Sequence, residues 1–215
     1  MPFSLDRIWQ RGRIICIIRP IRSKSKIFMP IKKYPIILNK NEVKKLLEAP
    51  SKTSLTGLRA KAILKITLNC GLRISEVVNL LMIDINLEFK ELKIVDGKGG
   101  RDRILTIPES TAEILREWRR KKPESDWFFS TLKGKKLGAR YLQKMVKRMV
   151  KKAGVDKRIH FHSLRHFFAT EFYKQTKDIY LLSLILGHAS IGTTTIYISL
   201  SGLEIKKGMA GFEEF

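Results

Sequence analysis

Six side chains in this 215-residue chain could together move a phosphoryl group. Planar guanidinium groups match the oxygens of a phosphodiester with paired hydrogen bonds, and a phenol can form a covalent bond to phosphorus. A tyrosine with an unperturbed pKa of about 10 is only about 0.1% ionised at pH 7, so a base or cationic surroundings must assist it. Because arginine and histidine can supply the positive charge that a metal ion would otherwise bring, we expect metal-free chemistry. In chain order the six residues are Arg73, Lys98, His162, Arg165, His188 and Tyr197.

Four short segments carry these residues: residues 71–76 (GLRISE), 97–99 (GKG), 162–166 (HSLRH) and 186–197 (LGHASIGTTTIY). Their order and local spacing resemble the tyrosine recombinase (phage-type integrase) family of site-specific DNA recombinases. The resemblance covers roughly residues 36 to 200. Any one of these segments is a weak signal, but the four in this order are specific.

The resemblance implies a role for each residue. Arg73 and Arg165 would clamp the scissile phosphate, and His188 would add a hydrogen bond to a nonbridging oxygen. Tyr197 would attack phosphorus and hold the DNA 3′ end as a phosphotyrosine, while His162 takes the phenolic proton.

The leaving 5′ oxygen needs a proton, and Lys98 is the expected acid because the lysine between glycines lies on a hairpin in this family. Glu76 follows Arg73 by three positions and is expected to orient it. His166 is expected to pack structurally. The remaining contacts expected with DNA phosphates come from Arg101, Arg103, Lys32 and Lys33.

Simpler interpretations of the same residues stay open. Arg73 could be a helix-terminal cation, Arg165 a surface ion-pair partner, and the lysine hairpin a solvated turn. Three histidines crowd seven positions from His160 to His166, yet no Cys or well-spaced carboxylate completes a tetrahedral zinc set. We expect no cofactor, neither metal nor ATP.

The charge of the chain indicates a polyanionic partner. Its 43 Lys and Arg residues outnumber 20 Asp and Glu residues, giving a formal net charge of +23. Nucleic acid is the commonest such partner, and double-stranded DNA is the one that the resemblance implies. The alternative is a ribosome-associated or thermophile protein with solvated lysine faces. Cys16 and Cys70 match no metal or redox spacing, and the apolar run at residues 14–18 is too short for a bilayer, so we expect a cytoplasmic protein without a membrane partner.

Three parts are expected along the chain. Residues 1–35 carry many Lys and Arg residues, a single acid and several prolines, which indicates a basic N-terminal arm or linker. Residues 36–200 form the catalytic domain that breaks and rejoins DNA. Residues 201–215 form a C-terminal tail, which could contact a neighbouring subunit.

The expected fold class is mainly α with a small antiparallel β-sheet (α+β), in the architecture of a tyrosine recombinase catalytic domain. Asn39 and Glu42 resemble a capping box, so a helix should begin near residue 40. Gly71 occupies the left-handed position that ends a second helix over about residues 56–69. Further helices are expected at about residues 110–121, 138–153, 163–175 and 177–186, and strands at residues 82–87, 92–95 and 104–107, with Lys98 at a hairpin tip.

The expected function is that of a site-specific DNA recombinase that integrates, excises or resolves DNA, acting as a homotetramer on paired sites. One alternative is DNA relaxation like that of a type IB topoisomerase. Another is a DNA-binding regulator that does not recombine its site. Most family members carry a separate helical core-binding domain before the catalytic one, whereas only about 35 residues precede it here. A minimal recombinase, a gene fragment and a mobile-element remnant, including an archaeal one, all stay open.

Overall fold

The computed structural model describes residues 4–10, 13–19, 35–95, 102–188 and 190–201, with side chains for residues 35–95, 102–188 and 190–198. The chain forms two compact units, Met1–Tyr34 and Pro35–Phe215. The first unit contains a β-hairpin of β1 (Ser4–Gln10) and β2 (Arg13–Arg19). The strands are antiparallel, with Gln10 opposite Arg13. Our reading of this region as a basic arm did not anticipate the two strands, and Lys32 and Lys33 lie outside the described residues.

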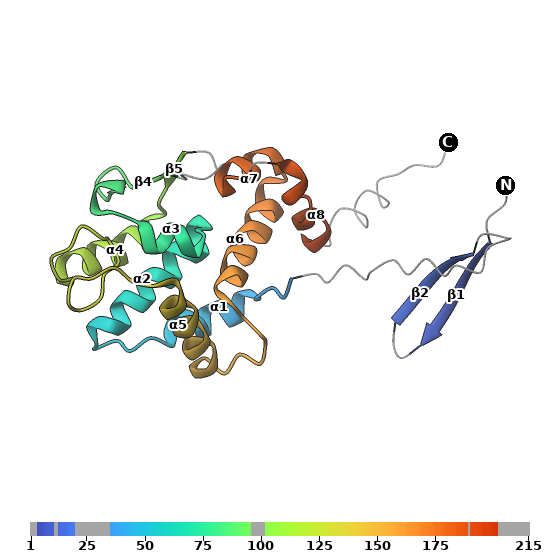
Figure 1. The fold of residues 1–215 in the computed structure, drawn as a ribbon, viewed down its shortest axis with the longest axis horizontal. Helices are drawn as coiled ribbons and strands as arrows, with labels where there is room; N and C mark the ends of the chain where they lie inside the picture. Colours follow the sequence, from blue (N-terminus) through green and yellow to red (C-terminus); the bar gives the residue numbers. More distant parts are fainter. Residues whose placement is uncertain (1–3, 11–12, 20–34, 96–101, 189, 202–215) are drawn as a thin grey trace. The chain divides into compact units, whose positions relative to one another are not determined.

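The second unit is mainly helical, as predicted (Figure 1). Its described strands form a sheet of order β3-β4-β5, in which both pairs are antiparallel. The strands are β3 (Ile85–Asn86), β4 (Glu91–Ile94) and β5 (Arg103–Thr106). The helices are α1 (Lys40–Glu48), α2 (Leu55–Cys70), α3 (Ile74–Asn79), α4 (Glu109–Lys121), α5 (Ala139–Lys152), α6 (Phe161–Thr176), α7 (Ile179–Leu186) and α8 (Ile196–Ser201), with 3-10 turns η1 (Met82–Asp84) and η2 (Ile191–Thr193). The predicted fold class is confirmed.

The ends of the first two helices follow from local chemistry. Asn39 Oδ1 accepts the Glu42 N–H at 2.8 Å and Glu42 Oε2 accepts the Asn39 N–H at 2.7 Å, which confirms the capping box. Gly71 ends α2 with a φ of 66°. A Cβ at Gly71 would lie 2.4 Å from Phe168 Cδ1, so the position needs glycine for its backbone and for its space. This turn places Arg73 directly before α3.

The first predicted strand is shorter than expected. Over residues 82–87 the chain begins with η1, and only Ile85–Asn86 pair with β4. The Asp84 carboxylate accepts the N–H of Leu81 at 2.9 Å, which favours a tight turn over an extended strand.

Two groups of buried side chains hold the second unit together. The larger group surrounds α2, whose Ile63, Leu64 and Ile66 are fully buried, and α2 contacts both α4 and α6. The smaller group joins α6 to α7 and α8, which lie side by side in Figure 1. Its fully or nearly fully buried members are Ala169, Tyr173, Leu182, Leu186 and Tyr197.

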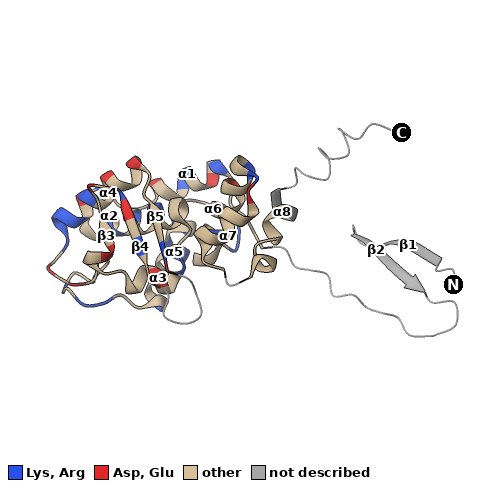
Figure 2. Ribbon diagram, turned by 90° about the horizontal axis from the view of Figure 1, so that it is seen from above, with Lys and Arg blue, Asp and Glu red and all other residues tan. Residues whose placement is uncertain are grey.

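Basic side chains cover one helix of this unit. Figure 2 shows red and blue residues mixed along α1 and α4, whereas α5 carries no acid. The basic residues of α5 are Arg140, Lys144, Lys147, Arg148, Lys151 and Lys152.

Within the described residues no single helix is long and apolar enough to cross a membrane. The bent pair Ile179–Leu186 and Ile191–Ile198 passes that test by length and composition alone, and its Leu182, Leu186 and Tyr197 are buried against α6.

Candidate active site

Arg165 lies on α6 with its side chain only 1% exposed. Its Nη1 donates to the Gly71 carbonyl at 2.8 Å and its Nη2 donates to the Leu186 carbonyl at 2.7 Å. These two carbonyls end α2 and α7, so the guanidinium joins both helix ends to α6. Burial, together with the positive charge of Arg73, lowers the pKa of Arg165 to about 10. The group therefore stays protonated at neutral pH.

Arg73 approaches the same place from the start of α3. Its backbone N–H donates to Glu76 Oε2 at 2.7 Å and its Nη1 donates to Glu76 Oε1 at 2.9 Å. Its Nη2 donates to the Gly187 carbonyl at 2.7 Å. The carboxylate of Glu76 is thus in the position that the expected orienting role requires. Both arginines are anchored on successive carbonyls of the turn that ends α7.

His188 follows that turn and contacts Arg165. Its Nε2 lies 3.1 Å from Arg165 Nη2, and its Nδ1 lies 2.8 Å from Thr194 Oγ1. A guanidinium can only donate, so Nε2 accepts and the ring proton sits on Nδ1, which donates to Thr194. Burial, then the charges of Arg165 and Arg73, lower the pKa of His188 to about 4. The ring is neutral at pH 7.

Glu76 also binds a third arginine. Arg103, at the start of β5, donates from Nη2 to both carboxylate oxygens of Glu76, at 2.9 and 3.0 Å. Arg165 Nη1 lies 3.8 Å from Glu76 Oε2. The side chain of Arg103 is only 7% exposed, although the sequence had suggested a phosphate contact at the surface.

Tyr197 lies on α8 and is only 2% exposed. Its hydroxyl is 3.0 Å from His166 Nδ1, and its ring packs with Leu182 and Leu186. Burial raises the pKa of Tyr197, an effect that the charge of Arg165 partly offsets. The pKa of His166 shifts in the opposite direction: burial, together with the charges of His162 and Arg165, lowers it to about 4. In this arrangement the phenol is protonated and shielded from solvent.

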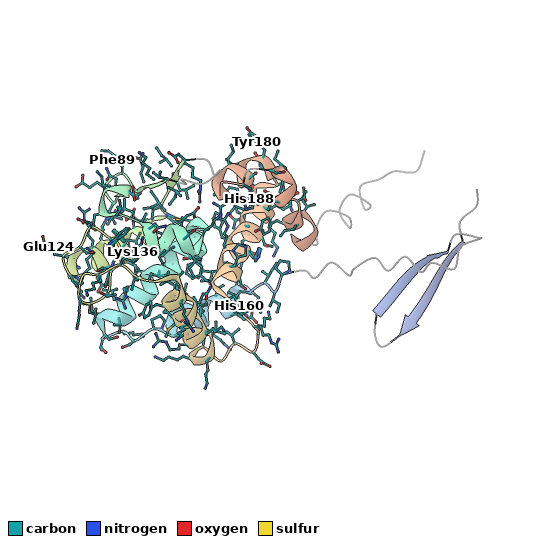
Figure 3. The ribbon with its side chains drawn as sticks, viewed as in Figure 1. Phe89, Glu124, Lys136, His160, Tyr180 and His188 are labelled. Carbon is teal, nitrogen blue, oxygen red and sulfur yellow. The ribbon has the colours of Figure 1, made fainter. Side chains whose placement is uncertain are left out.

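His162 lies one turn before His166 on α6, and the two rings meet edge to face with centroids 4.4 Å apart. Desolvation lowers the pKa of His162, and the charges of Arg165 and Arg73 lower it further. A neutral imidazole can accept a proton, as the expected base must. In Figure 3, His188 is near the junction of α6 with α7, whereas His160 is at the N-terminal end of α6. The described part of the chain contains no group of His, Cys, Asp or Glu that could hold a metal ion.

The structure thus brings together most of the predicted site. Lys98 and Arg101 lie outside the described residues. Sequence reasoning missed the buried hydroxyl of Thr194, which binds His188, and the use of the Gly187 carbonyl by Arg73. The run of three threonines at residues 193–195, close after His188, was the available signal. The described residues that converge are Arg73, Glu76, Arg103, His162, Arg165, His166, His188 and Tyr197.

Two solved structures that align with this chain are recombinases. A crystal structure of XerA recombinase aligns with a TM-score of 0.74 and 30% identity, covering 85% of this chain and 67% of that one. XerH site-specific recombinase, bound to its palindromic difH substrate, aligns with a TM-score of 0.71 and 32% identity, covering 85% of this chain and 54% of XerH. The fold and the site therefore define a tyrosine recombinase catalytic domain.

The sequence relationship supports the same class. A profile described as the phage integrase family matches residues 37–202, and the chain belongs to this family. Tyrosine recombinase XerD of Listeria innocua is 33% identical over 180 residues, covering 80% of this chain and 60% of XerD. XerD of Staphylococcus saprophyticus is 32% identical over 183 residues, covering 82% of this chain and 62% of that protein. The chain thus spans about three fifths of the length of these relatives.

Proposed function

We propose that this chain cuts and rejoins double-stranded DNA as a site-specific recombinase, through a 3′-phosphotyrosine on Tyr197. The observation that carries the proposal is the convergence of Arg73, Arg165 and His188 on the turn that ends α7. The two arginines bind successive carbonyls of this turn, and His188 contacts Arg165. Family membership supports the same reaction.

The two arginines suit a phosphate that gains charge. In the attacked state of a phosphodiester a second negative charge develops on the nonbridging oxygens, and buried guanidinium groups stabilise it strongly. Arg165 is held by two carbonyls and Arg73 by a carbonyl and a carboxylate, so neither has to be reorganised as the charge develops. Each role as a phosphate clamp is part of the proposal.

Phosphate binding must change the partner of His188. In the described arrangement Nε2 accepts from Arg165 and cannot donate to a phosphate oxygen. When a phosphate oxygen accepts this N–H of Arg165 in place of His188, Nε2 is released while Arg165 keeps its two carbonyl partners. Transfer of the ring proton from Nδ1 to Nε2, or protonation of the ring, then supplies the donor that the family role requires.

Formation of the new bond at phosphorus is accompanied by two proton transfers. The phenolic oxygen of Tyr197 forms the new P–O bond while the bond to the 5′ oxygen breaks. His162 takes the phenolic proton, and Lys98 gives a proton to the departing 5′ oxygen. Rejoining is the same sequence in reverse, with a 5′ hydroxyl attacking the phosphotyrosine, so bond energy is conserved and no ATP is consumed.

Tyr197 must leave its buried position before it can attack. Its hydroxyl is bonded to His166, and its ring is covered by side chains from α6 and α7. Movement of α8 would break one hydrogen bond and expose one aromatic ring. We propose that this movement accompanies assembly on DNA.

Assembly and location complete the proposal. Recombination joins four strand ends, so a homotetramer on two paired sites is the expected active form. The relative XerH was solved with its difH DNA substrate, which supports DNA as the partner here. We place the reaction in the cytoplasm, with Arg101, Lys32 and Lys33 as further phosphate contacts.

The test is covalent capture on a nicked suicide substrate, read on a denaturing gel in the presence of excess EDTA. Wild-type protein should form a protein–DNA adduct, and Tyr197→Phe should form none while binding DNA within several-fold of wild type. The matched control is Tyr180→Phe, because Tyr180 is exposed on α7 (Figure 3) and should not affect the adduct. An adduct that persists in Tyr197→Phe would place the nucleophile elsewhere.

A further inference from the structure

Arg103 is the charged residue in the site whose placement the recombinase reaction leaves unexplained. It lies on β5, a strand that contacts α7, and only 7% of its side chain is exposed. Its Nη2 is bonded to both oxygens of Glu76. Its Nε and Nη1 are buried and have no hydrogen-bond partner among the residues that the structure describes. Burying a cation with unused donors costs free energy, so its presence indicates that its charge is needed there.

Gly187 makes room for this guanidinium. A Cβ added at Gly187 would lie 2.8 Å from Arg103 Nη1 and 3.3 Å from its Cζ. Gly187 also has a φ of 63°, which ends α7, and its carbonyl accepts from Arg73. Arg103 therefore lies against the same turn that anchors the two phosphate-clamping arginines.

We propose, on the basis of the recombinase function above, that Arg103 is a positioning residue that sets both the charge and the geometry of the phosphate clamp through Glu76. Three guanidinium charges, from Arg73, Arg103 and Arg165, surround the single carboxylate of Glu76. The cluster is thus two charges positive.

That net charge matches the transition state better than the substrate. A phosphodiester carries one negative charge, and the attacked state carries two on its nonbridging oxygens. Without Arg103, Glu76 would neutralise one of the two clamp arginines, and a single net positive charge would face two negative ones. With Arg103 present, Glu76 orients Arg73 while the clamp keeps both of its charges. The neutral rings of His166 and His188, whose pKa values are about 4, add no charge at pH 7.

The alternative is that Arg103 grips the DNA backbone from the surface, as the sequence suggested. A surface contact would act on affinity and on its salt dependence, and equally on any duplex. A positioning residue acts on the rate of the chemical step, because its effect grows as the transition state forms. The two roles therefore separate in one experiment.

The experiment compares Arg103→Met and Arg103→Lys with wild type in single-turnover cleavage and in DNA binding. Arg103→Met should slow cleavage about a hundredfold while changing affinity less than about threefold, as expected for the loss of one buried electrostatic stabiliser. Arg103→Lys keeps the charge and should recover at least a tenth of the wild-type rate. The matched control is Arg116→Met. Arg116 forms a similar ion pair with Glu109, but about half of each side chain is exposed. This variant should leave the rate unchanged.

A methylphosphonate at the scissile position distinguishes an effect of the Arg103 charge from misfolding of the variant. Replacing one nonbridging oxygen by methyl removes one negative charge, so the gap between Arg103→Met and wild type should shrink to less than about tenfold on this substrate. A misfolded variant would show the same hundredfold gap on both substrates. That result, or a large loss of affinity with a flatter salt dependence, would overturn the positioning role.

A second readout needs no DNA and so stays valid if the proposed function fails. Arg103 is among the charges that hold down the pKa of His188. In an NMR titration Arg103→Met should raise the pKa of His188 towards its usual value of 6.5, and Arg103→Lys should raise it less. An unchanged titration would show that Arg103 is not coupled to the cluster. Absence of any adduct with wild-type protein, by contrast, would contradict the recombinase function itself.

Discussion

At the scale of residues, the site depends on backbone carbonyls as much as on side chains. Arg165 binds the carbonyls of Gly71 and Leu186, and Arg73 binds the carbonyl of Gly187. Carbonyls at helix ends are free to accept because they have no partner within their own helix. The direction of each guanidinium is therefore set by where α2 and α7 end, and both end at a left-handed glycine.

The buried histidines should make stability depend on pH. The folded-state pKa values of His166 and His188 are about 4, below the usual 6.5, because burial and neighbouring arginines disfavour the charged rings. Between these values the unfolded chain binds more protons than the folded one, so stability is full above pH 6.5 and falls towards pH 4. The melting temperature should drop between pH 7 and pH 5. A double variant, His166→Asn with His188→Asn, should show a flatter dependence, and a wild-type melting temperature constant over that range would contradict the buried, neutral rings.

The residues of the site could be predicted from the sequence, but their burial could not. Residue types and spacing identified Arg73, Arg165, His188 and Tyr197 as a set. The placement of Arg103 depends on Gly187, which is far away in the sequence, and on a carboxylate shared with Arg73. Such long-range packing leaves no local pattern, so the same cation looked like a surface contact.

At the scale of elements, local signals predicted the helices better than the strands. The capping box at Asn39 and the glycine at Gly71 mark helix ends by chemistry within a few residues. Strands depend on partners elsewhere in the chain, so β3 was predicted too long. The hairpin Ser4–Arg19 was not predicted, because the many basic residues and the nearby prolines indicated an irregular arm, although Ile14–Ile18 contains four β-branched isoleucines.

The hairpin of β4 and β5 should deliver an acid. Lys98 belongs to the connection between these paired strands, and its proposed task is to protonate the 5′ oxygen. Lys98→Ala should therefore cripple cleavage of normal DNA but act almost normally on a substrate with sulfur as the leaving atom, because a thiolate departs without a proton. The measurement is the rate of adduct formation on both substrates, with Lys93→Ala, on β4, as the control. Equal inactivity of Lys98→Ala on the sulfur substrate would assign Lys98 to another step.

Helix α7 should depend on its buried leucines for its place beside the site. Leu182 is fully buried among side chains of α6 and α8, whereas its neighbour Leu181 is 40% exposed. Leu182→Ala should lower the free energy of unfolding by about 2–5 kcal/mol, because it removes packed methyl groups and leaves a cavity. Leu181→Ala should change it by less than about 0.5 kcal/mol. Denaturant titration measures both, and equal effects would contradict the packing of α7 described here.

At the scale of the whole molecule, the positive charge of the chain and its family membership agree on a nucleic-acid partner. A net charge of +23 alone would fit any polyanion. The match to the phage integrase family over residues 37–202 narrows the proposed partner to DNA. Within the second unit, α5 adds a helix that is basic and carries no acid.

The N-terminal residues should contribute backbone contacts without base recognition. Each neutralised phosphate adds about 0.9 to the magnitude of the slope of log affinity against log salt, so about three to five contacts would add roughly 2.7 to 4.5 units. Deleting residues 1–33 should weaken binding to any duplex and flatten its salt dependence, while site preference survives. Salt titrations of the full-length and shortened proteins on specific and random DNA measure this. Parallel slopes would show that these residues do not contact phosphates.

The central claim is that Tyr197 becomes covalently joined to a DNA 3′ end. The most direct measurement is mass spectrometry of the trapped adduct after nuclease and trypsin digestion. Trypsin should release residues 178–206 as one peptide, which contains both Tyr180 and Tyr197. Fragmentation should place the nucleotide on Tyr197, linked through a 3′ phosphate, with a free 5′ hydroxyl on the other DNA product. A nucleotide on Tyr180 or any other residue, or a 5′-phosphate linkage, would contradict the proposed mechanism.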